Sequence, residues 1–258
     1  MVSGAPAAVQ PGASAAYATL LPASVVCFEL REPGDPASLL PEEAAPMGRA
    51  VASRVAEFAA GRLCARNALR AFGVDAFALR VGADRQPLWP AALIGSITHT
   101  AGLCAAAVAR RGTLVGVGID SELIARAAPE FLPRIGVARE VAWVQSLRPA
   151  EQSAAILLLF SAKEAFYKSQ YPLTAEWLDF HDVCVALDAW RPPAEGPAHA
   201  TPPTDGSRSV TGTQAAGFEI QPMRPMKVAG HAALPIRGKY RFHEEFVSAA
   251  VVLHAPHG

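Results

Sequence analysis

The chain has 258 residues, of which 51% are hydrophobic and 18% are charged, a balance that excludes an intrinsically disordered protein and predicts one large or two small buried cores. Lysine plus arginine equals aspartate plus glutamate, at 23 each, so no overall positive field favours nucleic acid or an anionic membrane. The longest apolar run falls far short of the roughly 18 residues that cross a bilayer. We therefore expect a soluble, cytoplasmic protein without nucleic-acid or membrane partners.

The N-terminal residues 1–24 are rich in alanine, proline, glycine and serine, and lack the basic start and compact apolar centre of a secretory signal. They predict a loose leader. The cysteines are scattered through apolar surroundings without a C-x-x-C pair, which predicts buried free thiols in a reducing compartment. They are Cys27, Cys64, Cys104 and Cys184.

The next part of the chain predicts one long helix among several strands. The helix is expected over 49–72, where apolar and basic residues alternate with helical spacing before Gly73. Three strands with short turns form a predicted meander, in which the first and third run in the same direction, so His99 and Asp120 should lie at one sheet edge. The strands are expected at 25–30, 77–81, 93–100, 103–111 and 113–120.

The remaining chain predicts short helices over 129–148 and a longer helix over 154–169 that Pro172 ends. Within this part, Phe131, Trp143 and Leu147 are predicted to be core rather than contact residues. The segment 191–214, rich in proline and polar residues, predicts a mobile loop. Strands are expected at 182–187, 216–223, 239–246 and 246–253, forming a second sheet.

Three acidic residues form the strongest chemical pattern. Asp120 and Glu122 are two apart in an extended segment, so their side chains share one face, while Ser121 faces the other way. Glu164 lies on the polar face of the helix over 154–169. Three carboxylates that leave room for phosphate oxygens are typical of a Mg²⁺ site. The basic residues expected around them are Arg54, Arg62, His99, Lys163 and Lys168.

Each of these patterns also has a simpler interpretation. The stretch FSAKEAFYK at 160–168 fits an exposed helix, because Glu164 and Lys168 are spaced i, i+4 and would stabilise it by roughly 0.2–0.5 kcal/mol. Asp120 and Glu122 alone fit a solvated turn after a strand. Arginines on the helix over 49–72 alone fit surface charges with partly buried stems.

The motifs together resemble a known family. GVGIDSE at 116–122, followed by FSAKEAFYK at 160–168, resembles the two-part signature of the 4'-phosphopantetheinyl transferases. Three further stretches are similar to the larger, monomeric class of that superfamily, especially its siderophore-synthesis branch, which is like enterobactin synthetase component D. They are AEFAAGRLCAR at 56–66, DRQPLWP at 84–90 and GSITHT at 95–100. The resemblance covers roughly residues 49–187 in order.

The resemblance implies an α+β fold of two similar α/β subdomains with a pseudo-two-fold relation and the active site in the cleft between them. We expect the first subdomain at 25–123, with the CoA-binding helix and the metal ligands Asp120 and Glu122. The second is expected at 124–258, with the helix that carries Glu164. The family's activity implies coenzyme A as co-substrate, Mg²⁺ or alternatively Mn²⁺ as metal, and a monomer.

The resemblance also assigns roles to individual residues. Asp120, Glu122 and Glu164 match the metal ligands, and Glu164 also matches the candidate general base. Lys168 matches the lysine that contacts phosphate and stabilises the leaving group. Lys163, Thr98 and His99 match further residues that contact phosphate in the family. Arg54, Arg62 and Arg85 match the basic residues that bind the 3'-phosphate and adenine side of CoA.

The implied reaction moves the phosphopantetheine arm of CoA to a serine of an apo acyl, peptidyl or aryl carrier protein and releases 3',5'-ADP. Two alternatives stay open at this point. A Mg²⁺-dependent nucleotide or pyrophosphate hydrolase would use the same carboxylates, and a non-catalytic CoA-binding module would use the basic helix alone. The sequence does not select among siderophore, polyketide, nonribosomal peptide and fatty acid pathways.

Overall fold

The computed structural model describes residues 12–193 and 212–256, and within them the strands form two sheets. The first has the order β1-β2-β4-β3 and the second β5-β9-β8-β7-β6. The first sheet contains β1 (Gly12–Ala13), β2 (Val25–Leu30), β3 (Leu93–Thr100) and β4 (Leu103–Arg110). The second contains β5 (Leu114–Leu123), β6 (Val183–Leu187), β7 (Ala216–Pro222), β8 (Ile236–His243) and β9 (Phe246–His254). The α-helices are α1 (Pro41–Ala44), α2 (Ala52–Arg70), α3 (Leu132–Ile135), α4 (Ala138–Ser146) and α5 (Pro149–Thr174).

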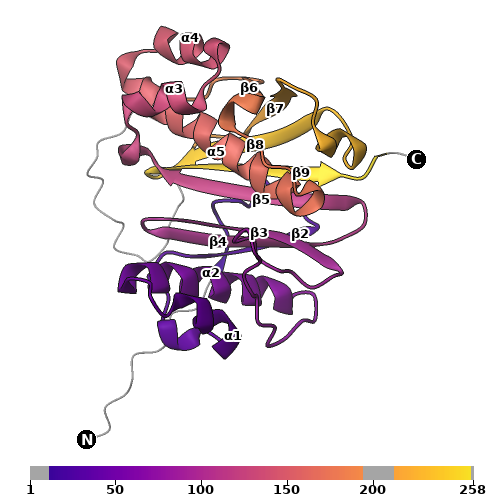
Figure 1. Ribbon diagram of the computed structural model, residues 1–258. Helices are drawn as coiled ribbons and strands as arrows, with labels where there is room; N and C mark the ends of the chain where they lie inside the picture. The colour runs from indigo at the N-terminus through magenta and orange to yellow at the C-terminus, as the bar shows by residue number, and fades with distance from the viewer. Residues whose placement is uncertain (1–11, 194–211, 257–258) are drawn as a thin grey trace, which may run out of the picture.

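The two sheets face each other, and each has one long helix on its outer side (Figure 1). Alternation along β4 shows the layering, because successive side chains of a strand point to opposite faces. One set of small residues packs toward the second sheet, and the other packs toward α2. The first set is Ala105, Ala107 and Ala109, and the second is Cys104, Ala106 and Val108. The α+β fold with two helix-covered sheets is therefore confirmed.

The strand β5 joins the two halves of the molecule. The predicted meander is correct for β3 and β4, which pair antiparallel, but wrong for β5, which pairs with β9 in the second sheet. Strand β5 is joined to β3 by hydrogen bonds to side chains rather than by backbone pairing. The amide of Ile119 donates to Ser96 Oγ at 3.1 Å, and the amide of Ser121 donates to Thr98 Oγ1 at 3.1 Å. This spacing makes β3 and β5 parallel, so His99 and Asp120 still lie at the same end.

Two glycines allow α5 to lie directly on β5. A Cβ atom at Gly118 would stand 1.8 Å from the carbonyl oxygen of Ala165, and one at Gly116 would stand 2.3 Å from that of Ser169. Real side-chain carbons do not approach this closely. The GVG part of the GVGIDSE motif is therefore needed for packing, since it brings the helix with Glu164 against the strand with Asp120.

Several local predictions differ from the structure. The leader prediction is wrong for residues 12–24, because Ala16, Tyr17 and Leu20 are buried between the sheets. Segment 77–81 forms one isolated bridge, Val81 to Pro87, rather than a strand. Helix α5 is longer than expected and continues through Pro172 to Thr174.

The remaining predictions concern the second half of the chain. The second sheet of 182–187 with three C-terminal strands is confirmed by its register. Most of the predicted loop over 191–214 lies outside the described residues, as do positions 1–11 of the predicted leader. All four cysteines are free. None of the helices that the structure describes combines the length and apolar character needed to cross a membrane.

Candidate active site

Asp120 is the buried centre of the site, with 3% of its surface exposed. One carboxylate oxygen, Oδ1, accepts a hydrogen bond from Lys168 Nζ at 2.6 Å and another from Thr98 Oγ1 at 3.2 Å. The other oxygen, Oδ2, is buried without a hydrogen-bond partner among the described residues. A buried carboxylate oxygen without a partner is energetically costly. The lone pairs of Oδ2 are therefore available to coordinate a metal ion or to accept a hydrogen bond from a bound molecule.

Glu122 and Glu164 complete an acidic group around Asp120. Burial and then the charge of Asp120 raise the pKa of Glu122 to about 7, and the charge of Glu164 acts in the same direction. Burial also raises the pKa of Glu164, which Lys168 opposes and Asp120 reinforces. The three carboxylates are thus close enough for each negative charge to disfavour ionisation of the others.

This donor set fits Mg²⁺ only as a partial site. No group of three or more His, Cys, Asp or Glu side chains within 12–193 and 212–256 is arranged to hold a metal ion unaided. Oδ2 of Asp120 nevertheless lacks a hydrogen-bond partner among the described residues. A divalent cation such as Mg²⁺ prefers oxygen ligands and would offset the repulsion among the three carboxylates. The residues present fit a Mg²⁺ ion whose coordination is completed by oxygens of the substrate.

Except for Lys163, the predicted basic residues line one cavity of about 620 Å³ between the two halves. Its walls come from α2, the loop 81–87, β3 and α5. Glu164 lines the same space as these cations, and Asp120 is linked to it through the hydrogen bond from Lys168. The basic side chains on its walls are Arg54, Arg62, Arg85, His99 and Lys168.

Two of these residues have clearly defined surroundings. His99 Nε2 accepts a hydrogen bond from Arg54 Nη1 at 2.6 Å, and burial together with the Arg54 charge lowers the pKa of His99, which leaves the imidazole neutral at pH 7. The Arg62 Nε donates to the carbonyl of Leu79 at 2.8 Å, and its guanidinium lies 4.0 Å from the centre of the Phe58 ring. Burial lowers the pKa of Arg62 to about 10, so it remains charged.

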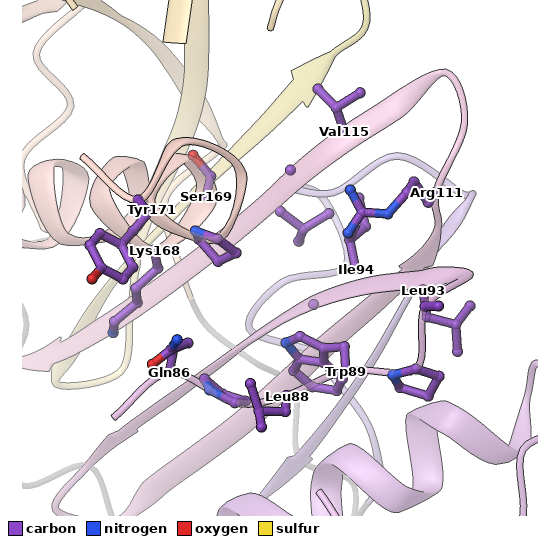
Figure 2. Close-up of a pocket in the computed structure, with 18 of the residues that line it drawn as sticks. Gln86, Leu88, Trp89, Leu93, Ile94, Arg111, Val115, Lys168, Ser169 and Tyr171 are labelled. Atoms are coloured by element: carbon purple, nitrogen blue, oxygen red, sulfur yellow. The ribbon is translucent and has the colours of Figure 1, made fainter. Parts of the chain in front are cut away.

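A neighbouring cavity of about 280 Å³ continues from the same region toward the start of β5 (Figure 2). In this view Lys168 and Tyr171, from the end of α5, face Gln86 and Trp89 of the loop 82–90 across the space. Gln86 and Lys168 also line the larger cavity, so the two spaces adjoin. Lys168 therefore stands where Asp120 and both cavities meet.

Thr98 and Lys163 have positions that differ from the predicted phosphate contacts. Thr98 is 1% exposed and binds Asp120 and the amide of Ser121, so it supports the acidic group from behind. Lys163 is 2% exposed, and its ammonium donates to Glu140 Oε2 at 2.7 Å, to Ile135 O at 2.7 Å and to Phe180 O at 2.8 Å. All three of its protons are used, so its predicted role at phosphate is wrong.

Lys163 instead joins α5 to Glu140, which also accepts hydrogen bonds from the amides of Val137 and Val185. We expect Lys163→Ala to lower the free energy of unfolding by about 3–5 kcal/mol, because Glu140 would remain buried without its cation. Chemical denaturation measures this loss. The CoA affinity of the folded variant should match the wild type, and a large loss of CoA affinity at unchanged stability would contradict this role.

Comparison with known proteins adds independent information. The model of the 4'-phosphopantetheinyl transferase N-terminal domain matches residues 42–109, and the model of the 4'-phosphopantetheinyl transferase superfamily matches residues 116–217. The chain is also 35% identical over 170 residues to the 4'-phosphopantetheinyl transferase Npt of Nocardia iowensis, which covers 66% of this chain and 76% of Npt. The chain belongs to the 4'-phosphopantetheinyl transferase superfamily.

Two further relatives of this transferase family bear on the predicted branch. The chain is 41% identical over 158 residues to the 4'-phosphopantetheinyl transferase Svp of Streptomyces mobaraensis, covering 60% of this chain and 64% of Svp, slightly less than two thirds of that relative. It is 41% identical over 118 residues to Enterobactin synthase component D of Salmonella typhi, covering 45% of this chain and 48% of that protein. The predicted likeness to the siderophore-synthesis branch is confirmed.

The two matched regions of this transferase chain meet where the structure changes sheets. The first ends at residue 109 in β4, and the second begins at residue 116 in β5. Because β5 belongs to the second sheet, Asp120 and Glu122 are placed with the second half, one strand earlier than the predicted boundary between 123 and 124. The site still forms between the halves, since Arg54, Arg62 and His99 belong to the first.

Proposed function

We propose that this chain transfers the 4'-phosphopantetheine arm of CoA to a serine of apo acyl, peptidyl or aryl carrier proteins, with Mg²⁺, and releases 3',5'-ADP. The observation that carries the proposal is one cavity lined by cations of the first half and by Glu164 and Lys168 of the second, with Asp120 bonded to Lys168 and Glu122 within the influence of both other carboxylates. A nucleotide with several phosphates requires the cations, and a metal held against its diphosphate requires the carboxylates. All of these groups come from one chain, which supports action as a monomer.

The cations of the large cavity would bind the nucleotide part of CoA. Arg54 and Arg62 on α2, together with Arg85 in the turn, are suited to the 3'-phosphate, since guanidinium groups bind phosphate through paired hydrogen bonds. Neutral His99 can donate a hydrogen bond to the diphosphate. These residues fix the bound CoA so that its β-phosphorus faces Glu164 and Lys168.

Asp120 Oδ2, Glu122 and Glu164 would hold the metal ion. When bound, Mg²⁺ neutralises charge that gathers on the diphosphate oxygens. Lys168 acts on the same charge, and its bond to Asp120 Oδ1 holds both side chains in place. Thr98 donates to the same oxygen, Oδ1, so Oδ2 of Asp120 points away from both Thr98 and Lys168.

Glu164 would also accept the serine proton. Its side chain borders the large cavity on one side and a smaller one of about 90 Å³ on the other, so a hydroxyl can reach it beside bound CoA. The serine oxygen bonds to the β-phosphorus, and the bond from that phosphorus to the bridging oxygen breaks. The proton moves to Glu164, and 3',5'-ADP leaves with the electron pair, stabilised by Lys168.

A mass assay tests this function directly. The purified chain is incubated with CoA, Mg²⁺ and a panel of apo carrier domains, and each carrier should gain the mass of one phosphopantetheine arm. No gain on any carrier, under conditions in which a known transferase modifies them, would refute the proposal. Release of 3',5'-ADP without a carrier would instead indicate a hydrolase. Unchanged cellular function of Glu164→Gln would indicate a non-catalytic CoA-binding module.

An exposed tryptophan beside Glu164 in the smaller cavity, and an exposed phenylalanine joined to the same cavity through Phe160 and Phe180, support a protein partner. Trp177 is 73% exposed, lines the smaller cavity with Glu164 and packs edge-on against Tyr167 at 5.5 Å between ring centres. Phe131 is 39% exposed and packs against Phe160 at 6.0 Å, so the prediction that it is a core residue is wrong in part. A carrier that delivers its serine to Glu164 would cover this aromatic surface.

We expect Trp177→Ala to raise KM for the carrier protein about 10-fold with little change in kcat, because an exposed tryptophan at the centre of an interface typically contributes 1–2 kcal/mol or more. Steady-state kinetics with varied carrier and saturating CoA measures this. Leu234→Ala is the matched control, since Leu234 is 58% exposed and its neighbours Ala233 and Pro235 line a different cavity, which contains none of the site residues. An unchanged carrier KM, or an equal rise in the control, would contradict the contact.

A further inference from the structure

A chain of buried hydrogen bonds reaches Ser121, the residue between Asp120 and Glu122, from the core between the two sheets. Tyr17 OH lies 2.6 Å from Ser121 Oγ, Ser121 Oγ lies 2.6 Å from Ser248 Oγ, and His243 Nε2 lies 2.7 Å from the same Ser248 oxygen. Each of these four residues is at most 1% exposed. The chain connects the N-terminal segment, β5, β9 and β8.

Ser121 is the residue between the two proposed strand ligands. Its side chain points away from those of Asp120 and Glu122, because neighbouring residues of a strand face opposite sides. Its amide is held by Thr98 Oγ1 at 3.1 Å, and the carbonyl of Asp120 accepts a hydrogen bond from Ser161 Oγ at 3.0 Å. The backbone that carries both carboxylates is therefore fixed by β3, by α5 and, through Ser121 Oγ, by Tyr17.

Tyr17 and His243, at the two ends of the hydrogen-bond chain, are both uncharged at pH 7. Burial raises the pKa of Tyr17 well above its ordinary value, and the charge of Asp120 adds to the effect, so the phenol keeps its proton. Burial, followed by the charges of Arg31 and Arg241, lowers the pKa of His243 to about 4, so its imidazole is neutral at pH 7. The hydrogen-bond chain therefore adds no charge behind the carboxylates.

We propose that Tyr17 is a positioning residue whose hydroxyl fixes Ser121 and thereby keeps the carboxylates of Asp120 and Glu122 directed into the site. The proposal rests on the metal-binding role assigned to these carboxylates above. The ring of Tyr17 fills space between the sheets, which phenylalanine would do as well. The hydroxyl lies 2.6 Å from Ser121 Oγ and also interacts with Ser248, the next residue of the same hydrogen-bond chain, so its removal tests positioning apart from packing.

The experiment compares Tyr17→Phe with Tyr240→Phe. Tyr240 is also 0% exposed, and its hydroxyl donates to the carbonyl of Ala189 at 2.7 Å and accepts from the amide of Arg191, away from β5. Mn²⁺ affinity in the presence of CoA is measured by electron paramagnetic resonance, together with amide hydrogen exchange at Ser121 and the melting temperature. The metal readout does not require turnover.

Tyr17→Phe should bind Mn²⁺ about 10-fold more weakly and exchange the Ser121 amide faster, because residues that orient metal ligands typically change affinity by this amount. Tyr240→Phe should keep wild-type values for both, at a similar loss of melting temperature. If Tyr17→Phe fails to fold, Ser121→Ala removes the same bond from the other side and should show the same loss of affinity.

The outcomes separate this inference from the proposed function. Wild-type affinity in Tyr17→Phe, or in Ser121→Ala where that variant replaces it, overturns the positioning role while the transferase proposal stands. Equal losses in Tyr17→Phe and Tyr240→Phe also overturn it, since they reflect general destabilisation. If the wild-type protein with CoA binds no Mn²⁺, both the metal assignment and this inference fail.

Discussion

Asp120→Ala should lower kcat/KM for carrier modification at least about 10³-fold. The change removes the unpartnered Oδ2 proposed to bind the metal and also the partner of Lys168 Nζ. A metal ion that neutralises phosphate charge contributes several kcal/mol to transition-state stabilisation, and about 4 kcal/mol corresponds to that factor. Initial rates across a range of Mg²⁺ concentrations measure the loss, which added metal should not restore.

A matched acidic residue controls for the loss of a carboxylate. Asp188 is 53% exposed at its side chain and pairs with Arg237 on the surface of the second sheet, so Asp188→Ala should keep wild-type kinetics. Asp120→Asn keeps the shape of the side chain and its contact with Thr98 while removing the charge. Turnover of Asp120→Ala within about threefold of the wild type would remove Asp120 from the proposed ligand set.

The sequence predicted the elements with strong periodicity well. Helix α2, the β3–β4 hairpin and the strands β6, β7 and β9 lie close to where alternation and turn residues placed them, whereas β8 begins and ends three residues before the predicted strand at 239–246. The carboxylate pair was also predictable, since the two-residue period of an extended strand alone places Asp120 and Glu122 on one face. These features depend on neighbours in sequence, and local spacing is therefore sufficient to find them.

The errors at Lys163, β5 and Tyr17 share a different cause, because each depends on a partner distant in sequence. Lys163 lies on a polar helical face, but its ammonium group is buried and donates hydrogen bonds to Glu140 and two backbone carbonyls. The residue spacing within α5 gives no indication of these three partners. The predicted meander failed because β5 found its ladder partner in β9, more than a hundred residues later. Tyr17 stands in an alanine- and proline-rich segment whose composition is typical of disorder, yet its ring fills the space between the sheets.

The role of the GVGIDSE motif changes most between sequence and structure. The sequence alone already indicates metal ligands or a solvated turn for its acidic residues, whereas the role of its glycines follows only from the packing of α5 on β5. The nearest approach is at Gly118, where the carbonyl of Ala165 occupies the place of a side chain. The distance between Asp120 on the strand and Lys168 on the helix therefore depends on a residue that lines neither of the two adjoining cavities.

We expect Gly118→Ala to lower the free energy of unfolding by about 3 kcal/mol and kcat/KM by at least about 10²-fold. The new methyl group would stand 1.8 Å from a backbone oxygen, which cannot rotate aside, so helix and strand must separate. Displacement of catalytic groups by about 1 Å is enough for such a loss of rate. Chemical denaturation and initial-rate kinetics on the folded variant measure the two effects.

Gly112→Ala is the matched control, because a Cβ atom there meets nothing within 4 Å and the residue lies in the turn before β5. It should retain wild-type stability to within about 0.5 kcal/mol and full activity. Wild-type activity in Gly118→Ala would show that α5 can move from β5 without disturbing the site. A loss of activity with the Asp120 to Lys168 contact intact in a structure of the variant would also contradict the argument, because that contact is what the glycine is expected to preserve.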